Sequence, residues 1–206
     1  VEPTAVAVHD VGRAGITAGE KVLVVGGGPV GLLIAVVARI EGASVLMVEL
    51  DAYRRAIAGK LGFRVLDPRT TDVAAEVERW TAGAGVPVAF EVSGSAGGMA
   101  SAVDALGVRG RLCLVAIHAQ PREVHLHRFF WRELSLVGAR LYTRDDFERA
   151  VDLVGSGDVP AGALISRVVP LRDAEKAFDA LESADSVMKV LVDCRNPAET
   201  EDGARV

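Results

Sequence analysis

Short aliphatic runs alternate with amphipathic stretches along most of the chain. The aliphatic runs, which predict strands, are Lys21–Val25, Ser44–Val48, Arg64–Leu66, Val88–Val92, Arg111–Ala116 and Leu134–Val137. The stretches between and after them, which predict helices, are Pro29–Ile40, Ala52–Leu61, Asp72–Trp80, Gly98–Leu106 and Asp145–Val154. Strands that alternate with helices pair in parallel through right-handed crossovers. The pattern therefore predicts an α/β fold with a doubly wound, six-stranded parallel sheet.

The alternation changes after Gly157–Pro160. Ile165–Val169 and Met188–Val192 each predict a strand, and Leu171–Leu181 predicts a helix between them. This short strand–helix–strand piece has too little apolar surface to form a domain alone. We therefore expect it to be part of a second domain.

Composition and charge narrow the class of protein. Half of the 206 residues are apolar and a quarter are charged, as in globular domains with a sizeable core. Aromatic residues make up only 5%, so aliphatic side chains must fill that core, which suits buried parallel strands. The net charge of -5 argues against a nucleic-acid partner. With no apolar run of membrane-spanning length and no visible secretory leader, we expect a cytoplasmic protein with no membrane partner.

A glycine motif follows the first predicted strand. Residues 26–31 read Gly-Gly-Gly-Pro-Val-Gly and match G-x-G-x-x-G, with a strand before them and a helix after them. Gly26 allows the tight turn, Gly28 lets the backbone approach a diphosphate, and Gly31 lets the helix pack closely on the strand. Pro29 suits the first turn of that helix, whose amides and dipole would face the phosphates. The sequence therefore predicts a Rossmann domain that binds a dinucleotide.

An acidic residue at the end of the second strand completes this motif. Glu49 lies 18 residues beyond Gly31, where a carboxylate can accept hydrogen bonds from the adenosine ribose hydroxyls. The same carboxylate would repel a 2′-phosphate, which favours NAD over NADP. Arg54 and Arg55 follow closely and could accommodate that phosphate, although a solvated helix face explains them as well. We expect Glu49 to outweigh them and NAD to be the cofactor.

Stretches spread over nearly the whole chain match a known family. They are residues 2–9, 18–32, 53–55 with 61–63, 90–94, 110–115, and 147–150 followed by 170–178. Together they resemble the zinc-dependent medium-chain dehydrogenase/reductase family, especially its sorbitol, butanediol and threonine dehydrogenases. The resemblance extends to about Asp193. It implies an NAD-dependent, zinc-requiring oxidoreductase that transfers a hydride between NAD and a secondary alcohol, diol or polyol.

The resemblance also implies particular cofactor-binding residues. It would put Val30 under the diphosphate, Glu49 on the ribose and Arg54 beside the adenine. The remaining implied residues are Ser93, then Val115, Ala116 and Ile117 at the nicotinamide end, and Ala139, Arg140 and Leu141 on the far wall of that pocket. All of these loops follow predicted parallel strands at their carboxyl ends, where ligands bind open α/β sheets.

Zinc is a further implication of the resemblance, and this chain alone is not expected to hold it. In the family, Cys, His and Glu residues of an N-terminal domain bind the catalytic zinc, and this sequence begins after that point. Glu2 falls where the family has a further ligand or near-ligand carboxylate, so it is the one catalytic and metal-ligating candidate here. Zinc would polarise the substrate oxygen as a Lewis acid. We therefore expect the chain to bind cofactor but not to turn over alone.

The expected organisation follows from these assignments. It comprises a linker helix from the catalytic domain over 1–19, an NAD-binding Rossmann domain over 20–160, the C-terminal part of the catalytic domain over 161–195, and a flexible tail over 196–206. The expected partners are a small alcohol or polyol substrate and further copies of the chain, because the family associates through this domain. The predicted strand Leu134–Val137 offers an edge for such association.

Two other functions stay open. The chain could be an NAD(H)-binding regulatory module without enzyme activity, but such a module would not need the piece after Pro160. It could also be a zinc-free reductase of the quinone type, which would prefer NADPH, but Glu49 argues against it.

Several residues have simple structural interpretations that we weigh against a functional one. His125 and His127 lie on one side of a predicted extended segment and lack a third metal ligand, so a solvated loop is the simpler explanation. His118 follows the fifth strand and is a weak candidate for a substrate contact, with a surface-loop histidine favoured. Cys113 is most simply a small core residue, and Trp131 a packing or subunit contact.

Overall fold

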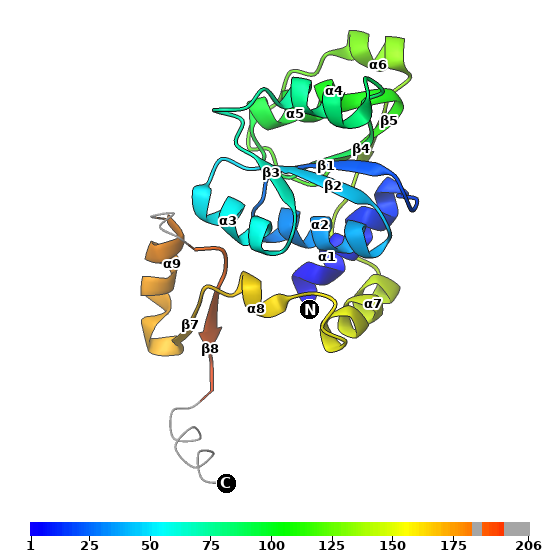
Figure 1. Ribbon diagram of the computed structural model, residues 1–206. Coiled ribbons are helices and arrows are strands. Elements are labelled where there is room, and N and C mark those ends of the chain that lie inside the picture. Colours follow the sequence, from blue (N-terminus) through cyan, green and yellow to red (C-terminus); the bar gives the residue numbers. More distant parts are fainter. Residues whose placement is uncertain (183–186, 196–206) are drawn as a thin grey trace. The chain divides into compact units, whose positions relative to one another are not determined.

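The computed structural model describes residues 1–182 and 187–195, and the chain divides into two compact units (Figure 1). The first unit is Val1–Val159, and the second begins at Pro160. The flexible tail expected over 196–206 lies outside the described residues. The finer division, with a separate linker over 1–19, stays a prediction.

A six-stranded parallel sheet forms the centre of the first unit. Its strands are β1 (Lys21–Val25), β2 (Ser44–Val48), β3 (Arg64–Leu66), β4 (Val86–Glu91), β5 (Leu106–Leu114) and β6 (Ser135–Gly138). Their spatial order is β3-β2-β1-β4-β5-β6, so the winding direction reverses between β1 and β4. This order is that of the Rossmann fold and confirms the predicted doubly wound sheet.

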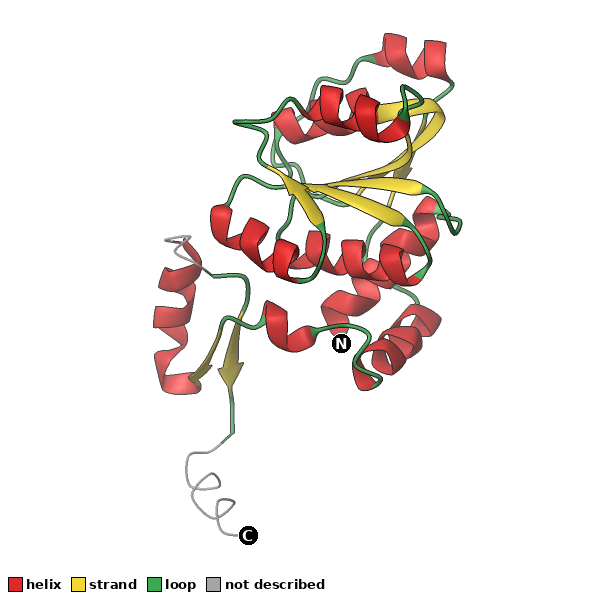
Figure 2. Cartoon of the chain, viewed as in Figure 1, coloured by secondary structure: helices red, strands yellow, loops and turns green. Residues whose placement is uncertain are grey.

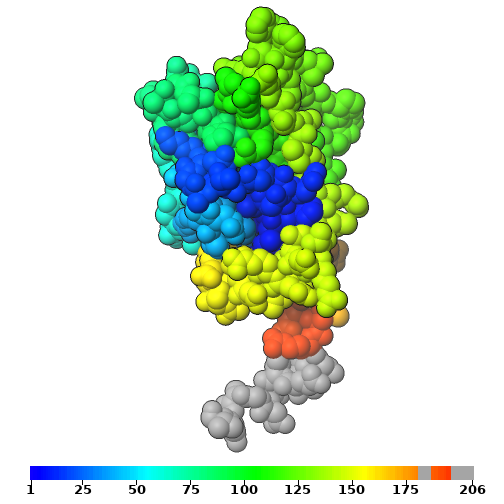
Figure 3. Space-filling view, turned by 90° about the vertical axis from the view of Figure 1, so that its right-hand side faces the viewer, coloured from blue at the N-terminus to red at the C-terminus, as the bar shows by residue number. Residues whose placement is uncertain are grey.

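Helices cover both faces of the sheet (Figure 2). One face carries α1 (Glu2–Ala14), α2 (Pro29–Ile40) and α3 (Ala52–Lys60), and the other carries α4 (Val73–Thr81) and α5 (Ala96–Ala105). Two further helices are α6 (Leu126–Arg132), which contacts β5, and α7 (Arg144–Gly155), which packs against α1. Figure 3 shows the blue N-terminal residues at the surface, next to the yellow-green residues around α7.

The core is aliphatic, as the composition predicts. Alternate residues of β1 face the two helical layers, so Leu23 joins a cluster with Val77 of α4 and Met99 of α5. On the other face α2 buries a continuous run from Gly31 to Ala38. A helix buried nearly all round needs apolar residues on every side, which explains its uniformly apolar sequence.

Side-chain caps define where several helices begin. Asp51 accepts a hydrogen bond from the amide of Arg54 at 2.8 Å and starts α3, and Asp72 starts α4 in the same way. Thr143 and Asp146 form a reciprocal capping box at the start of α7. Such caps satisfy amides that have no partner within the helix. In contrast, α2 has no side-chain cap.

The second unit, taken by itself, contains a two-stranded parallel sheet. Its elements are α8 (Ala161–Leu164), β7 (Arg167–Pro170), a 3-10 turn (Leu171–Asp173), α9 (Ala174–Glu182) and β8 (Val190–Asp193). Ser166 links the two strand ends, because its amide donates to the carbonyl of Lys189 and its hydroxyl accepts from the amide of Met188. The predicted strand–helix–strand order is therefore confirmed, whereas α8 is an additional element.

The prediction of an extended segment at His125 and His127 is wrong. Helix α6 begins at Leu126, with His125 as the residue before its first turn. The indole N–H of Trp131 donates to Nε2 of His127 at 2.6 Å, because residues four apart lie one turn apart on a helix. This nitrogen is therefore already occupied, which removes the suggested metal pair.

None of the helices formed by residues 1–182 and 187–195 has the length and apolar character that crossing a bilayer requires.

Candidate dinucleotide-binding site

The glycine loop, residues 26–28, leaves β1 in a turn that only glycine fits. Gly26 has a φ of 107°, and a Cβ there would lie 2.9 Å from the amide nitrogen of Ser93. A Cβ on Gly31 would lie 1.9 Å from the carbonyl oxygen of Gly26. The first glycine therefore permits the turn and the second lets α2 pack against it, as the sequence predicts for these two positions.

The start of α2 faces this loop without a competing side chain. Gly28 precedes the helix in an extended conformation, Pro29 occupies its first turn, and no side chain caps the end. The first amides of a helix have no partner within it, and the helix dipole adds positive potential there. At Gly28 a Cβ would have only Nη1 of Arg54 nearby, at 3.6 Å. The backbone at this end can therefore approach an anion closely.

Glu49 holds the glycine loop as well as facing the site. Its side chain is mostly buried, with the residue 8% exposed. One carboxylate oxygen accepts from the amide of Gly27 at 2.6 Å, and the other accepts from the amide of Asp51 at 2.7 Å. A carboxylate has about four acceptor positions, so two remain for ribose hydroxyls. Gly27 must also stay small, because a Cβ there would lie 3.0 Å from Cβ of Glu49.

A cavity of about 610 Å³ lies at the carboxyl ends of β1, β2 and β4, and we call it the switch-point cavity. Its lining residues are Val25, Gly26, Gly28, Val48, Glu49, Leu50, Arg54, Pro68, Arg69, Val92, Ser93, Ser95, Gly97, Gly98 and Ser101. Open α/β sheets bind ligands where the strand order reverses, and this volume suits a small-molecule site. The structure thus brings five predicted residues together here: Gly26, Gly28, Glu49, Arg54 and Ser93.

Two arginines near Glu49 are held by one carboxylate, that of Asp67. Nη1 of Arg55 donates to the carbonyl of Glu49 at 3.1 Å, and Nη2 pairs with Asp67 at 3.0 Å. Arg69 also binds Asp67, and donates to the carbonyl of Leu50 at 2.7 Å. The hydrogen bonds from Arg69, helped by the charge of Arg55, hold the pKa of Asp67 below its usual range. Both guanidinium groups are therefore engaged by this carboxylate.

Other predicted site residues lie outside the switch-point cavity. Val115 and Ala116 follow β5, and their amides donate to the carbonyl of Glu91 at 3.0 and 3.1 Å, while Ile117 is 96% exposed. Ala139, Arg140 and Leu141 follow β6, and Leu141 is exposed with a φ of 61°. These segments lie at the carboxyl ends of their strands, as predicted. Their contact with a cofactor stays a prediction.

The described residues do not fit zinc by themselves. In residues 1–182 and 187–195, no group of three or more His, Cys, Asp or Glu side chains is arranged to hold a metal ion. Glu2 is exposed in the first turn of α1. Its assignment as a ligand stays a prediction.

The structure changes the interpretation of His118 and adds Glu91 to the site. The side chain of His118 is only 11% exposed, and its Nε2 lies 2.9 Å from Oε2 of Glu91. Glu91 is fully buried at the end of β4 and also accepts from Ser93 and Gly94. His118 is therefore not the surface-loop histidine favoured from the sequence. The sequence signal that could have identified Glu91 was its own position, as an acidic residue within an otherwise apolar predicted strand, two positions before Ser93.

The strand order, the glycine turn and the acid at the end of β2 define a Rossmann-fold protein of the dinucleotide-binding type. The sequence profile of the zinc-binding dehydrogenase family matches residues 29–156. The chain belongs to this family, which confirms the resemblance found in the sequence.

Individual relatives are known in sequence and in structure. A 2-dehydro-3-deoxy-L-galactonate 5-dehydrogenase from Pseudoalteromonas atlantica is 44% identical over 94% of this chain and 57% of its own length. The crystal structure of (2R,3R)-butanediol dehydrogenase from Bacillus subtilis superposes with a TM-score of 0.88 at 34% identity, over 94% of this chain and 56% of that one.

A third relative was solved with a cofactor. It is a Sinorhizobium meliloti protein of the zinc-binding dehydrogenase type, bound to NADP, with a TM-score of 0.83 at 30% identity over 93% of this chain and 57% of that one. The chain therefore spans little more than half the length of the relatives it matches.

Proposed function

We propose that this chain is the NAD(H)-binding part of a dehydrogenase that acts on a secondary hydroxyl group of a diol, polyol or sugar acid. The observation that carries the proposal is the buried carboxylate of Glu49, held against the glycine loop at one end of the switch-point cavity. The family membership supports the reaction class. The named activities of the galactonate and butanediol dehydrogenases support the substrate class.

The residues of the chain have separate tasks in this proposal. Glu49 accepts hydrogen bonds from the adenosine ribose, and the amides at the start of α2 bind the diphosphate. The second half of the cofactor extends across the switch point toward β4, β5 and β6, as in two-part dinucleotide sites. The bound nicotinamide supplies a hydride acceptor or donor. The chain positions and shields it.

The preference for NAD is part of this proposal. Because Glu49 is charged and fixed by two amides, a 2′-phosphate beside it would meet like charge that cannot turn away. Arg54 is the cation of the cavity wall that could offset this repulsion, since Arg55 and Arg69 both bind Asp67. A relative that is 30% identical was solved with NADP bound, so the affinities for both nucleotides are compared in the test below.

We also propose that zinc ligation and turnover depend on residues other than the described ones. The family implies the metal, whereas the described part of this chain offers Glu2 alone as a candidate ligand. The isolated chain should therefore bind NADH without oxidising an alcohol.

A homo-oligomer is the expected state of association. Strand β6 is an edge of the sheet, and Leu136 on it is exposed. Leu126, Phe130 and Trp131 of α6 are also exposed. An unpaired edge beside exposed apolar side chains suits pairing with a second copy about a two-fold axis. Light scattering on the purified chain measures this, and a monomer at all concentrations would contradict it.

The direct test of the proposed function is titration of the chain with NADH and NADPH, followed by nicotinamide fluorescence. We expect NADH to bind more tightly, and Glu49→Ser to weaken NADH while leaving NADPH unchanged or improved. Glu41→Ser, which removes an exposed acid beyond the far end of α2, is the matched control. Failure to bind either nucleotide would refute the proposal. Tighter binding of NADPH would favour the zinc-free reductase alternative.

A further inference from the structure

Glu91 ties two loops together at the carboxyl ends of β4 and β5. These are the β4–α5 loop, residues 92–95, and the β5–α6 loop, residues 115–125. The carboxylate is fully buried, and one oxygen accepts from the amide and hydroxyl of Ser93 and from the amide of Gly94. The other oxygen accepts from the imidazole of His118 at 2.9 Å. One side chain therefore binds both loops.

Arg122 closes this arrangement into a ring of hydrogen bonds. Its Nε donates to Nδ1 of His118 at 3.1 Å, and its Nη2 donates to the carbonyl of Gly94 at 3.2 Å. Because Nε of arginine can only donate, Nδ1 of His118 is the acceptor and its proton lies on Nε2. His118 is thus a neutral imidazole that donates to Glu91, and the charges of Arg122 and Glu91 offset each other across it.

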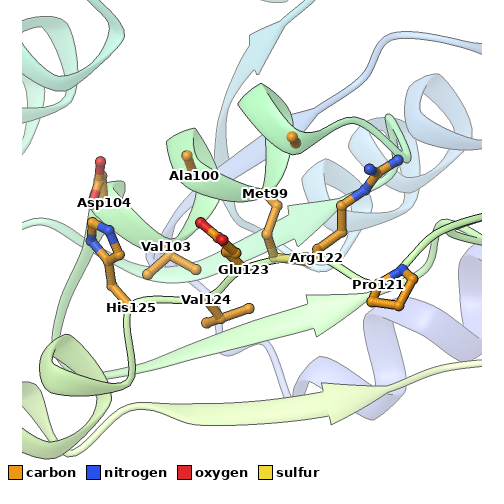
Figure 4. Close-up of a pocket in the computed structure, with 10 residues that line it drawn as sticks. Met99, Ala100, Val103, Asp104, Pro121, Arg122, Glu123, Val124 and His125 are labelled. Atoms are coloured by element: carbon orange, nitrogen blue, oxygen red, sulfur yellow. The ribbon is translucent and has the colours of Figure 1, made fainter.

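The later part of the β5–α6 loop is separated from α5 by a cavity, although Val124 packs against the core. A cavity of about 360 Å³ lies between residues 121–125 and α5, and Figure 4 shows the side chains that line it. Met99 and Val103 line it from α5, and Val124 from the loop. Apolar contacts are lost wherever such a space separates two surfaces. The ring therefore adds a side-chain attachment of this loop to the sheet end, beside the amide bonds of Val115 and Ala116 and the packing of Val124.

The ring lies beside the switch-point cavity. Ser93, which Glu91 holds through two hydrogen bonds, lines that cavity, and so does Gly98. A Cβ on Gly98 would lie 2.0 Å from Oγ of Ser93 and 3.0 Å from the Glu91 carboxylate, so α5 begins close against the ring. In a doubly wound sheet, the strands beyond the switch point bind the second mononucleotide of the cofactor.

We propose that the Glu91–His118–Arg122 ring is a positioning cluster for the nicotinamide half of the cofactor. The inference rests on the proposed function. Glu91 is fully buried and makes no contact with ligand itself. It acts by fixing Ser93, which lines the switch-point cavity, and the β5–α6 loop, which lies outside that cavity at the neighbouring strand end. The side chain of His118 connects the β5–α6 loop to Glu91, and a substitution can remove this connection.

The test compares a whole dinucleotide with its adenosine half. The 206-residue chain is titrated with NADH by fluorescence and with ADP-ribose, which lacks the nicotinamide, by calorimetry. His118→Ala should weaken NADH about tenfold, the size of one charge-assisted hydrogen bond, and change ADP-ribose less than about twofold. His118→Gln retains an N–H donor for Glu91 and should recover most of the NADH affinity.

Controls separate positioning from loss of structure. His127→Ala removes an imidazole from α6, away from the ring, and should change neither affinity. Thermal unfolding by circular dichroism checks each variant, and Arg122→Lys, which keeps the charge but loses the Nε donor, replaces His118→Ala if that variant does not fold. Long-range proton–nitrogen spectra of His118 should show a protonated Nε2 and a bare Nδ1.

The outcomes distinguish the two claims. If ADP-ribose loses as much affinity as NADH, or NADH loses less than about twofold, the positioning role is wrong and the proposed function stands. The opposite tautomer of His118 would also refute the ring. If the unchanged chain binds neither ligand, the proposed function fails and this inference fails with it.

Discussion

Replacing Asp10 should make the protein more stable at alkaline pH. Asp10 lies in α1 with 0% exposure, and in the described structure neither carboxylate oxygen has a hydrogen-bond partner. Burial raises the pKa of Asp10 from 3.8 to about 7; the charge of His9 opposes this rise and that of Asp146 adds to it. Cys113 of β5 packs against the same turn, its thiol donating to the carbonyl oxygen of Asp10.

The sign of the pH dependence follows from the direction of the shift. Below pH 3.8 the folded and unfolded forms both hold the proton, so Asp10 contributes no pH dependence. Between 3.8 and about 7 the folded form binds the proton more tightly, so stability falls as pH rises. Above about 7 the full penalty applies, and the shift corresponds to about 4 kcal/mol.

Asp10→Asn removes the titration but keeps the shape of the side chain. The buried amide would itself lack partners, at a cost of about 1–3 kcal/mol, so a net gain of about 1–3 kcal/mol is expected at pH 8. The gain should shrink steadily and vanish or reverse near pH 5. Urea unfolding of both proteins at pH 5, 6, 7 and 8 measures this difference.

Asp152→Asn, on the exposed surface of α7, is the control, because it removes an acidic side chain that is not buried. A difference between Asp10→Asn and the parent that stays constant from pH 5 to 8 would refute the reasoning, because an unshifted carboxylate is ionised throughout that range.

Three other predictions test separate features. Gly31→Ala should lower stability by about 1–3 kcal/mol or more and abolish NADH binding, because the added Cβ meets backbone. Gly12→Ala, in α1 with open space around it, should keep or slightly raise stability in the same thermal unfolding experiment, because Ala favours a helix more than Gly does. Glu49→Ser should weaken NADH about tenfold and so narrow the preference over NADPH, as measured by fluorescence titration. The folded chain should show one reactive thiol toward a disulfide reagent, Cys194, which is exposed. Burial, followed by the charge of Asp10, raises the pKa of Cys113 to about 12, and this thiol should react only after unfolding.

Much of the fold was predictable because its signals are local. The strand Lys21–Val25, the glycine turn and the all-apolar helix are adjacent in sequence, and each alone restricts the backbone. Glu49 was predictable for the same reason, since the end of β2 lies at a fixed distance from the motif in a βαβ unit.

The features that the sequence did not predict depend on contacts that sequence spacing does not encode. Helix α6 has too few residues for a clear period. Of its aromatic residues, Phe129 packs against the core, whereas Phe130 and Trp131 are exposed. His118 lies 27 positions from Glu91 along the chain, so only the parallel pairing of β4 and β5 brings them together. The bond from Gly27 to Glu49 likewise crosses from one strand end to the next.

Two buried acidic residues hold the loops at the carboxyl ends of the strands. Glu49 ends β2 and binds the amides of Gly27 and Asp51, whereas Glu91 ends β4 and binds Ser93, Gly94 and His118. They lie on opposite sides of β1, and each fixes the loop on its own half of the sheet. Glu49 remains partly exposed, so its carboxylate can bind a ribose directly. Glu91 is fully buried and can act only through the residues that it holds. In the proposed function, the same residue type therefore binds the ligand in one half of the sheet and positions the binding loops in the other.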